Sequence, residues 1–109
     1  MNPSEEGGGK GAFREELEGL DRLLEHRVRL AVAVLLARHH ELPFARLLEL
    51  TGETNGNLGA NLRRLEEAGY LEVRKEFVRR RPVSRYRLNR KGRAALRAHV
   101  AALDRLLHR

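Results

Sequence analysis

The chain has 109 residues, no cysteine and a formal net charge of +7 at pH 7. This length suits one domain with a modest core, and the lack of cysteine excludes disulfides and thiolate metal sites. The basic balance favours a polyanionic partner. No apolar run approaches the roughly 20 residues that span a bilayer, and the N-terminus lacks the hydrophobic segment of a signal peptide. We therefore expect a cytoplasmic protein without membrane contact.

The first half of the chain reads as a series of helices. We expect residues 1–12, which are rich in glycine, to form a disordered arm. Leucines at helical spacing predict a short amphipathic helix over residues 13–25. Residues 27–39 are so apolar that the helix predicted there should be the buried centre of the domain. A short strand over residues 42–44 and a helix over residues 45–50 are expected next.

The strongest pattern begins at Thr54, which is a good N-cap for a helix that runs to Ala68. Gly69 is suited to end this helix. Leucines at positions i, i+4 and i+7 face the core. The opposite face holds small residues, polar residues and arginines: Gly56, Asn57, Ala60, Arg63 and Arg64, with Asn61 on the flank. A helix with such a face can enter a groove of DNA.

A hairpin and a last helix complete the chain. Apolar and charged residues alternate after Gly69, which predicts two strands with one face packed inward. Their connection contains Arg79, Arg80 and Arg81, three adjacent cations that repel one another unless an anion binds. Asn89 can cap a final helix over residues 90–109.

Positive charge is concentrated in the second half of the chain. Residues 63–97 contain 13 Lys+Arg and 4 Asp+Glu, a net charge of +9, whereas residues 1–62 contain 7 against 10, a net charge of −3. The excess coincides with the end of the helix that begins after Thr54 and with the hairpin. This distribution favours phosphate binding by those two elements.

A set of sequence pieces in a fixed order resembles the winged helix-turn-helix transcriptional regulators, and is nearest to their compact MarR/ArsR-like group. The pieces are Arg29–Leu35, Phe44–Leu47, Asn57–Leu62, Leu65–Leu71, Lys75–Val78, Arg81–Leu88 and Gly92–Leu96. Two departures stand out, because the wing position that often carries glycine is Arg79 here and the cap of the last helix, often threonine, is Asn89. The first makes the wing more basic.

The resemblance implies an α+β, mostly helical fold in which residues 13–109 form a single winged-helix domain with a two-stranded wing. It also implies a homodimer built by terminal helices, 13–25 and 90–109, whose two recognition helices read a pseudo-palindromic operator in double-stranded DNA. We expect a transcriptional repressor rather than an enzyme, with no cofactor. The expected DNA contacts are Thr54, Asn55, Gly56, Asn57, Ala60, Asn61, Arg63, Arg64, Lys75, Arg79, Arg80, Arg81 and Arg85. The expected dimer interface is Leu17, Leu20, Leu24, Leu96, Val100, Leu103 and Leu107.

Several alternatives remain beside this interpretation. The domain would serve protein assembly if the basic wing were incidental, and RNA is a third possible partner. Arg63 and Arg64 would be ordinary surface residues if they paired with the glutamates that follow them. The terminal leucines would be ordinary core if they packed within one subunit. His99, Asp104 and His108 suggest a metal site, but their spacing is poor and no cysteine supports it. No catalytic arrangement is recognisable.

Overall fold

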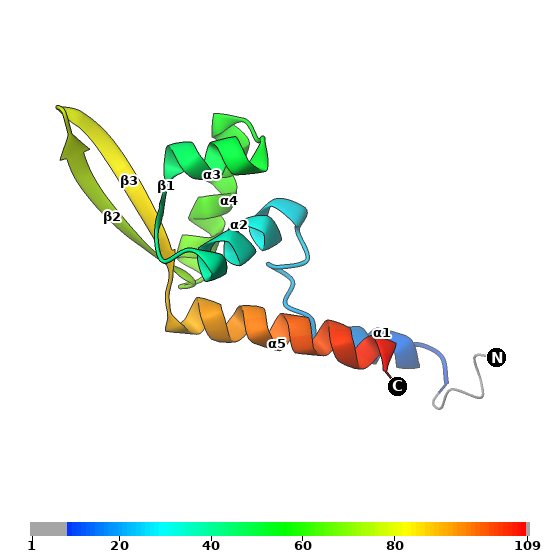
Figure 1. Cartoon of the computed structure of the whole chain (residues 1–109). Coiled ribbons are helices and arrows are strands. Elements are labelled where there is room, and N and C mark those ends of the chain that lie inside the picture. The colour runs from blue at the N-terminus through cyan, green and yellow to red at the C-terminus, as the bar shows by residue number, and fades with distance from the viewer. Residues whose placement is uncertain (1–8, 109) are drawn as a thin grey trace.

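The computed structural model describes residues 9–108, so most of the arm expected over residues 1–12 lies outside the described residues. Helices and strands follow in this order (Figure 1): α1 (Ala12–Leu17), α2 (Arg27–Arg38), β1 (Leu42–Pro43), α3 (Phe44–Thr51), α4 (Asn55–Glu67), β2 (Leu71–Val78), β3 (Arg81–Leu88) and α5 (Arg90–Leu107). The chain thus has the mostly helical α+β composition that the sequence predicts.

The sheet has three antiparallel strands in the order β1-β3-β2. The two strands of the expected hairpin pair from Leu71 opposite Leu88 to Val78 opposite Arg81. The short strand around Pro43 is confirmed and adds a third strand at the edge of β3, where Leu42 lies opposite Tyr86. Because β1 is so short, the outer half of the hairpin extends away from the helices as a free wing (Figure 1).

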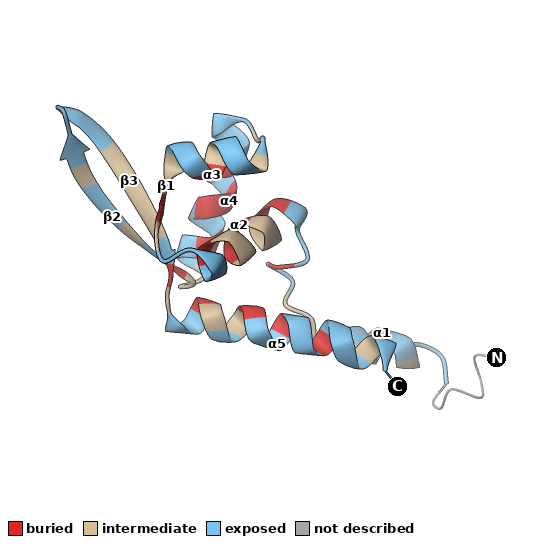
Figure 2. Ribbon diagram, in the orientation of Figure 1, coloured by how far each residue is buried: buried red, intermediate tan, exposed pale blue. Residues whose placement is uncertain are grey.

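The core lies between α2, α4 and the base of the sheet, where Figure 2 shows the buried residues gathered. Its largest fully buried side chains are leucines and one valine: Leu24, Leu36, Leu47, Leu58, Leu62, Leu65 and Val32. The predicted central position of α2 is confirmed, because this helix contacts α3, α4, α5 and β3. The buried leucines of α4 are those predicted from their helical spacing, so the other face of α4 is left to solvent.

The residues that cap and end the helices in the second half of the chain are as predicted. The Thr54 hydroxyl accepts a hydrogen bond from the backbone N–H of Asn57 at 3.1 Å, and the Asn89 side chain accepts one from the N–H of Gly92 at 2.8 Å. Such caps satisfy backbone donors that have no partner within the helix. Gly69 follows α4 with φ 81°, a left-handed conformation that glycine adopts without steric cost.

The prediction of one helix over residues 13–25 is wrong, because α1 ends at Leu17. A carboxylate oxygen of Asp21 accepts a hydrogen bond from the backbone N–H of Leu23 at 2.9 Å, which favours a local turn over a continuing helix. The chain then runs inward and places Leu24 in the core, fully buried. Periodicity alone did not reveal this turn.

The first turn of α5 is fixed against the end of α4 and the base of the wing. The backbone N–H of Asn89 donates to the Tyr70 carbonyl at 3.0 Å, and its side chain donates to the Gly69 carbonyl at 2.7 Å. Gly92 packs so closely that an added Cβ would clash with the Tyr70 carbonyl and lie 2.7 Å from Leu88 Cδ1. From this anchor α5 runs past the core and projects from it together with α1 (Figure 1).

A buried polar network joins the N-terminal segment to α5. His99 is buried, and its Nδ1 accepts a hydrogen bond from the backbone N–H of Asp21 at 3.0 Å. The Tyr70 hydroxyl donates to the other carboxylate oxygen of Asp21. Burial and this carboxylate raise the pKa of Tyr70 to about 12. The network ties the segment after α1 to α5 and to the start of β2.

Candidate nucleic-acid interface

The exposed face of α4 is the one predicted for groove recognition. The residues that line it are all exposed: Thr54, Asn55, Gly56, Asn57, Ala60, Arg63 and Arg64. A Cβ added at Gly56 would meet nothing within 4 Å, so this part of the helix presents bare backbone to any partner. The exposed face of α4 therefore has small residues at Gly56 and Ala60 and arginines toward its C-terminal end.

Asn61, which the sequence placed among the DNA contacts, is 4% exposed and lies inside the domain. Its side-chain oxygen accepts a hydrogen bond from Nη1 of Arg29 at 2.9 Å, and its nitrogen donates to the Asn57 carbonyl at 2.9 Å. The expectation of a base contact by Asn61 does not fit this position. The error arises because the flank of α4 that bears Asn61 packs against α2, which the helical wheel of α4 does not reveal.

A chain of polar contacts leads from α2 to the exposed Asn57. Arg29 also donates through Nε to the Leu23 carbonyl at 2.8 Å, and burial together with the charge of Arg64 lowers its pKa. Beyond Asn61, the side-chain oxygen of Asn57 accepts a hydrogen bond from the Asn61 amide at 3.2 Å. The Asn57 amide in turn donates to Glu53 at 2.5 Å. These contacts fix which end of the Asn57 side chain is donor and which is acceptor.

The two faces of the wing differ in chemistry. Side chains alternate along a strand, and residues directly opposite on paired strands share a face. One face therefore bears Leu71, Val73, Lys75 and Phe77 of β2, opposite Leu88, Tyr86, Ser84 and Pro82 of β3. This face begins in the core. Arg63 and Glu66 of α4 lie close enough to Tyr86 to influence its pKa, so α4 flanks this face.

The other face of the wing is covered by ion pairs. Arg74 contacts Glu41 and Glu76, each at 2.7 Å, and Arg85 contacts Glu76 at 2.5 Å. The hydrogen bonds from these arginines lower the pKa of both glutamates. Arg85, predicted as a DNA contact, thus has a carboxylate partner and lies on the face away from α4, because Arg85 and Arg74 are directly opposite.

The remaining predicted cations have no ion-pair partner within the part of the chain that the structure describes. Within residues 9–108 no ion pair involves Arg63, Arg64, Lys75, Arg79, Arg80 or Arg81. The alternative that Arg63 and Arg64 pair with the glutamates one turn further along α4 therefore finds no support among the described residues. All six side chains are exposed and available to an anion.

The wing tip holds two of these arginines in a left-handed conformation. Arg79 and Arg80 form the two-residue connection between the paired residues Val78 and Arg81, with φ of 52° and 66°. Two-residue hairpin connections favour this geometry, for which asparagine and glycine are the preferred residues. Residues with a side chain at such φ values cost about 1–3 kcal/mol each. The tip therefore displays two cations at a cost to the stability of the hairpin.

The terminal apolar residues divide between core and surface. Leu24 and Leu96 are buried in the core, so their expected place in a subunit interface is wrong. In both terminal segments the apolar residues that recur at helical spacing include core residues as well as exposed ones. The spacing alone does not distinguish the two, which accounts for the error. Leu20 is half-buried. The others are exposed on α1 and the outer part of α5: Leu17, Val100, Leu103 and Leu107, together with Phe13.

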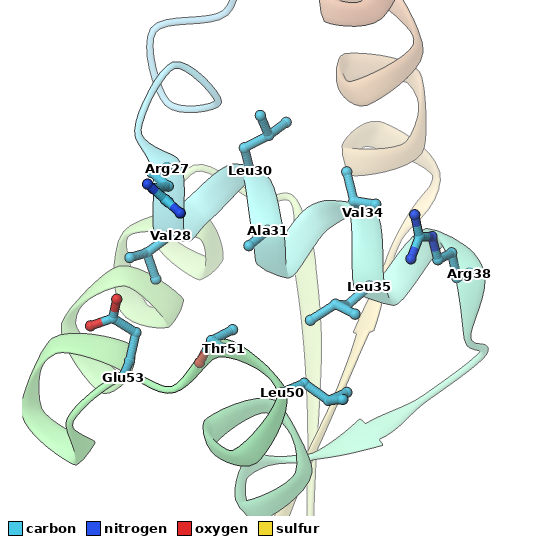
Figure 3. Close-up of a pocket in the computed structure, with 10 residues that line it drawn as sticks. All are labelled: Arg27, Val28, Leu30, Ala31, Val34, Leu35, Arg38, Leu50, Thr51 and Glu53. Atoms are coloured by element: carbon cyan, nitrogen blue, oxygen red, sulfur yellow. The ribbon is translucent and has the colours of Figure 1, made fainter.

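A shallow apolar groove of about 460 Å³ lies between α2 and the end of α3 (Figure 3). Leu30, Val34 and Leu35 of α2 line it together with Leu50 of α3. Glu53, the partner of Asn57, lies at its edge. The groove is thus adjacent to the start of α4 without being part of its exposed face.

The described residues contain neither a candidate metal site nor a membrane span. Among residues 9–108 no group of three or more histidine, cysteine, aspartate or glutamate side chains is arranged to hold a metal ion. His99 faces the interior, while His108 contacts Asp104 at 3.2 Å on the surface. None of the described helices has the length and apolar character needed to cross a bilayer.

Comparison with known sequences gives a family match. Residues 28–107 match the winged helix DNA-binding domain family. An uncharacterised protein of Methanocaldococcus jannaschii is 32% identical over 73 residues, which cover 67% of this chain and 79% of that protein.

Comparison with solved structures gives the same fold. The transcriptional regulator homologue of Pyrococcus horikoshii superposes with a TM-score of 0.78 at 24% identity, covering 86% of this chain and 95% of that one. The YusO protein of Bacillus subtilis superposes with a TM-score of 0.67 at 14% identity, covering 91% of this chain and 72% of that one. At these identities the likeness concerns the fold, and it confirms the mostly helical α+β winged-helix prediction.

Proposed function

Because the chain belongs to the winged helix DNA-binding domain family, we propose that it binds double-stranded DNA sequence-specifically and regulates transcription as a dimeric repressor. In this proposal residues 13–109 form one functional domain of the MarR/ArsR-like kind. The observation that carries it is a set of six cations on α4 and the wing that have no ion pair among residues 9–108, whereas the other wing arginines are neutralised by glutamates. Unpaired cations bind phosphates without first breaking an internal ion pair.

Within the site, Asn57 is our candidate for direct base reading. Its amide has two donor hydrogens and its oxygen two acceptor positions. Asn61 and Glu53 occupy one of each, which leaves one donor and one acceptor free on a side chain of fixed orientation. Adenine presents the complementary pair in the major groove. Gly56 and Ala60 would allow the helix backbone to approach the bases closely.

The cations supply the sequence-independent part of the affinity. We assign phosphate contacts to Arg63, Arg64 and Lys75, and to the tip arginines Arg79–Arg81. If about four of these six cations in each subunit of a dimer neutralise one phosphate each, log K should fall with log salt with a slope of roughly −7. Affinity for a duplex selected from a random pool, measured from low to physiological salt, tests this. A flat dependence would refute DNA binding by this surface.

The dimer in this proposal is built from α1 and the outer part of α5. These helices project from the core and carry exposed Phe13, Leu17, Val100, Leu103 and Leu107. Two projecting helices with exposed apolar side chains are suited to burial against a second copy of the chain. A two-fold axis there would give two recognition helices for a pseudo-palindromic operator, about one turn of DNA or 34–36 Å apart.

A further inference from the structure

Phe77 is the most exposed aromatic side chain among residues 9–108, with 78% of its surface accessible. It lies near the end of β2, directly opposite the exposed Pro82 of β3. An aromatic ring that remains in water gains nothing from the hydrophobic effect, and a ring on a free hairpin has no core to reach. Phe77 and Pro82 together form a small apolar platform at the outer end of the wing.

The platform lies on the face of the wing that α4 flanks. Phe77 shares its face with Lys75 and Val73, and Val73 lies opposite Tyr86 at the edge of the core. At a rise of about 3.3 Å per residue, Phe77 stands roughly 13 Å beyond Val73, and the outer half of the wing extends away from the helices (Figure 1). The platform therefore lies beyond the core, on the face of the wing that α4 flanks near Tyr86.

The surroundings of the platform define its partner. Lys75 lies two residues away on the same face, Arg79 and Arg80 form the tip, and Arg81 lies opposite Val78 on the other face, all without an ion pair among the described residues. The opposite face of the wing is neutralised by Glu72 and Glu76. A ring bordered by free cations fits a polyanion that also exposes apolar surface. The minor groove of DNA does so, because sugars and base edges line it between two rows of phosphates.

We propose that Phe77, supported by Pro82, enters the minor groove of bound DNA beside the wing arginines and partly unstacks a base step. This inference rests on the proposed DNA binding and adds a contact that carries no charge. Apolar side chains that wedge between base steps kink the duplex, and flexible pyrimidine–purine steps are the easiest to kink. Phe77 would thus favour operators that have such a step where the wing lies.

Phe77→Ala and Phe77→Trp test the proposal, with Val78→Ala as the matched control. Val78 adjoins Phe77 on β2, is also exposed, and points to the opposite face. With a duplex selected from a random pool by the wild-type protein, Phe77→Ala should bind about 10-fold more weakly with an unchanged salt slope, because no phosphate contact is lost. Energy transfer between dyes at the duplex ends should show a smaller bend. Val78→Ala should match the wild type.

Phe77→Trp adds a spectroscopic test, because the chain has no tryptophan. The single indole should keep near wild-type affinity and change its emission when the duplex saturates the protein, since stacking on bases removes it from water. Unchanged emission together with full binding by Phe77→Ala would overturn the proposal. Lowered self-association of Phe77→Ala in sedimentation would assign the ring to a protein contact and also overturn it. Absence of duplex binding by the wild-type protein would instead refute the proposed function.

Discussion

Asn61 accepts a hydrogen bond from Arg29, and this contact joins the helix proposed to read DNA to the helix at the centre of the core. Arg29 is the one charged residue among the apolar residues 28–37, and it is partly buried. Its guanidinium is held by Asn61 and by the Leu23 carbonyl. Through the Asn61 amide the pair fixes the orientation of the Asn57 side chain, so it supports the surface proposed to read DNA without belonging to it.

Replacement of Asn61 by alanine should therefore act on stability first. We expect a loss of about 1–3 kcal/mol in the free energy of unfolding, because the partly buried Arg29 loses an acceptor and Asn57 loses a donor. Urea denaturation measures this, and Asn57→Ala, which removes an exposed side chain, serves as the control. An Asn61→Ala protein of wild-type stability with altered sequence preference would return Asn61 to the list of base contacts.

The double substitution Arg79→Asn with Arg80→Gly should stabilise the wing and weaken DNA binding. Asparagine and glycine suit the positive φ values of 52° and 66° at the tip, so we expect the free energy of unfolding to rise by about 1–2 kcal/mol. Loss of two cations per subunit should reduce the magnitude of the salt slope by about 3 to 4 for a dimer. The alanine pair at the same positions removes the charges and keeps the strained turn. It should bind as weakly as the Asn-Gly variant while gaining no stability.

Two glycine-to-alanine changes should have opposite effects on thermal stability. Gly56→Ala should stabilise α4 by about 0.5–1 kcal/mol, because glycine is costly in a helix and the new methyl group meets no neighbour. Gly92→Ala should destabilise by about 1–3 kcal/mol, because its methyl group would clash with the Tyr70 carbonyl and Leu88. Equal shifts of the melting temperature for both variants would contradict the close approach of Gly92 to the Tyr70 carbonyl.

The tyrosines should ionise later in the folded protein than in the unfolded chain. Burial and Asp21 raise the pKa of Tyr70 to about 12 from an ordinary 10.0, and burial also raises that of Tyr86. A raised folded pKa stabilises the protein fully below pH 10, and this contribution is lost between pH 10 and 12. Phenolate absorbance can follow both groups, because the chain has two tyrosines and no tryptophan. Tyr70→Phe should remove the step that belongs to Tyr70, and if the absorbance lost in this variant is already present at pH 10 in the folded wild-type protein, the network is contradicted.

Leu103→Glu should convert the proposed dimer into a monomer that keeps its fold. Burial of a carboxylate in an apolar interface costs several kcal/mol without a partner, whereas Leu103 is 41% exposed in the single chain and tolerates charge there. Sedimentation should show the change, together with loss of specific DNA binding because one half-site binds weakly. Val78→Glu, at an equally exposed position on the wing, is the control and should remain dimeric. A Leu103→Glu protein that still dimerises would place the interface elsewhere.

Signals that act over a few residues predict where the helices and strands begin and end. They do not predict which residues from distant parts of the sequence pack together. Thr54, Gly69 and Asn89 act within a few residues of themselves, so their roles as caps and breakers were readable from sequence. Leu24 and Asn61 depend on segments distant in sequence, and their burial was not readable. The same limit applies to the wing, where alternation gives the two faces and only the three-dimensional contacts show that Glu76 neutralises one of them.

The close approach of Gly92 to the Tyr70 carbonyl also makes α5 a lever with a fixed pivot. The helix has 18 residues and is therefore about 27 Å long, so a tilt of about 10° at the pivot moves its far end by about 5 Å. In the dimer that we propose, the far ends meet at the two-fold axis. A small angular change at this one glycine would then alter the distance between the two recognition helices by a base-pair step or more, and so the operator spacing that the protein accepts.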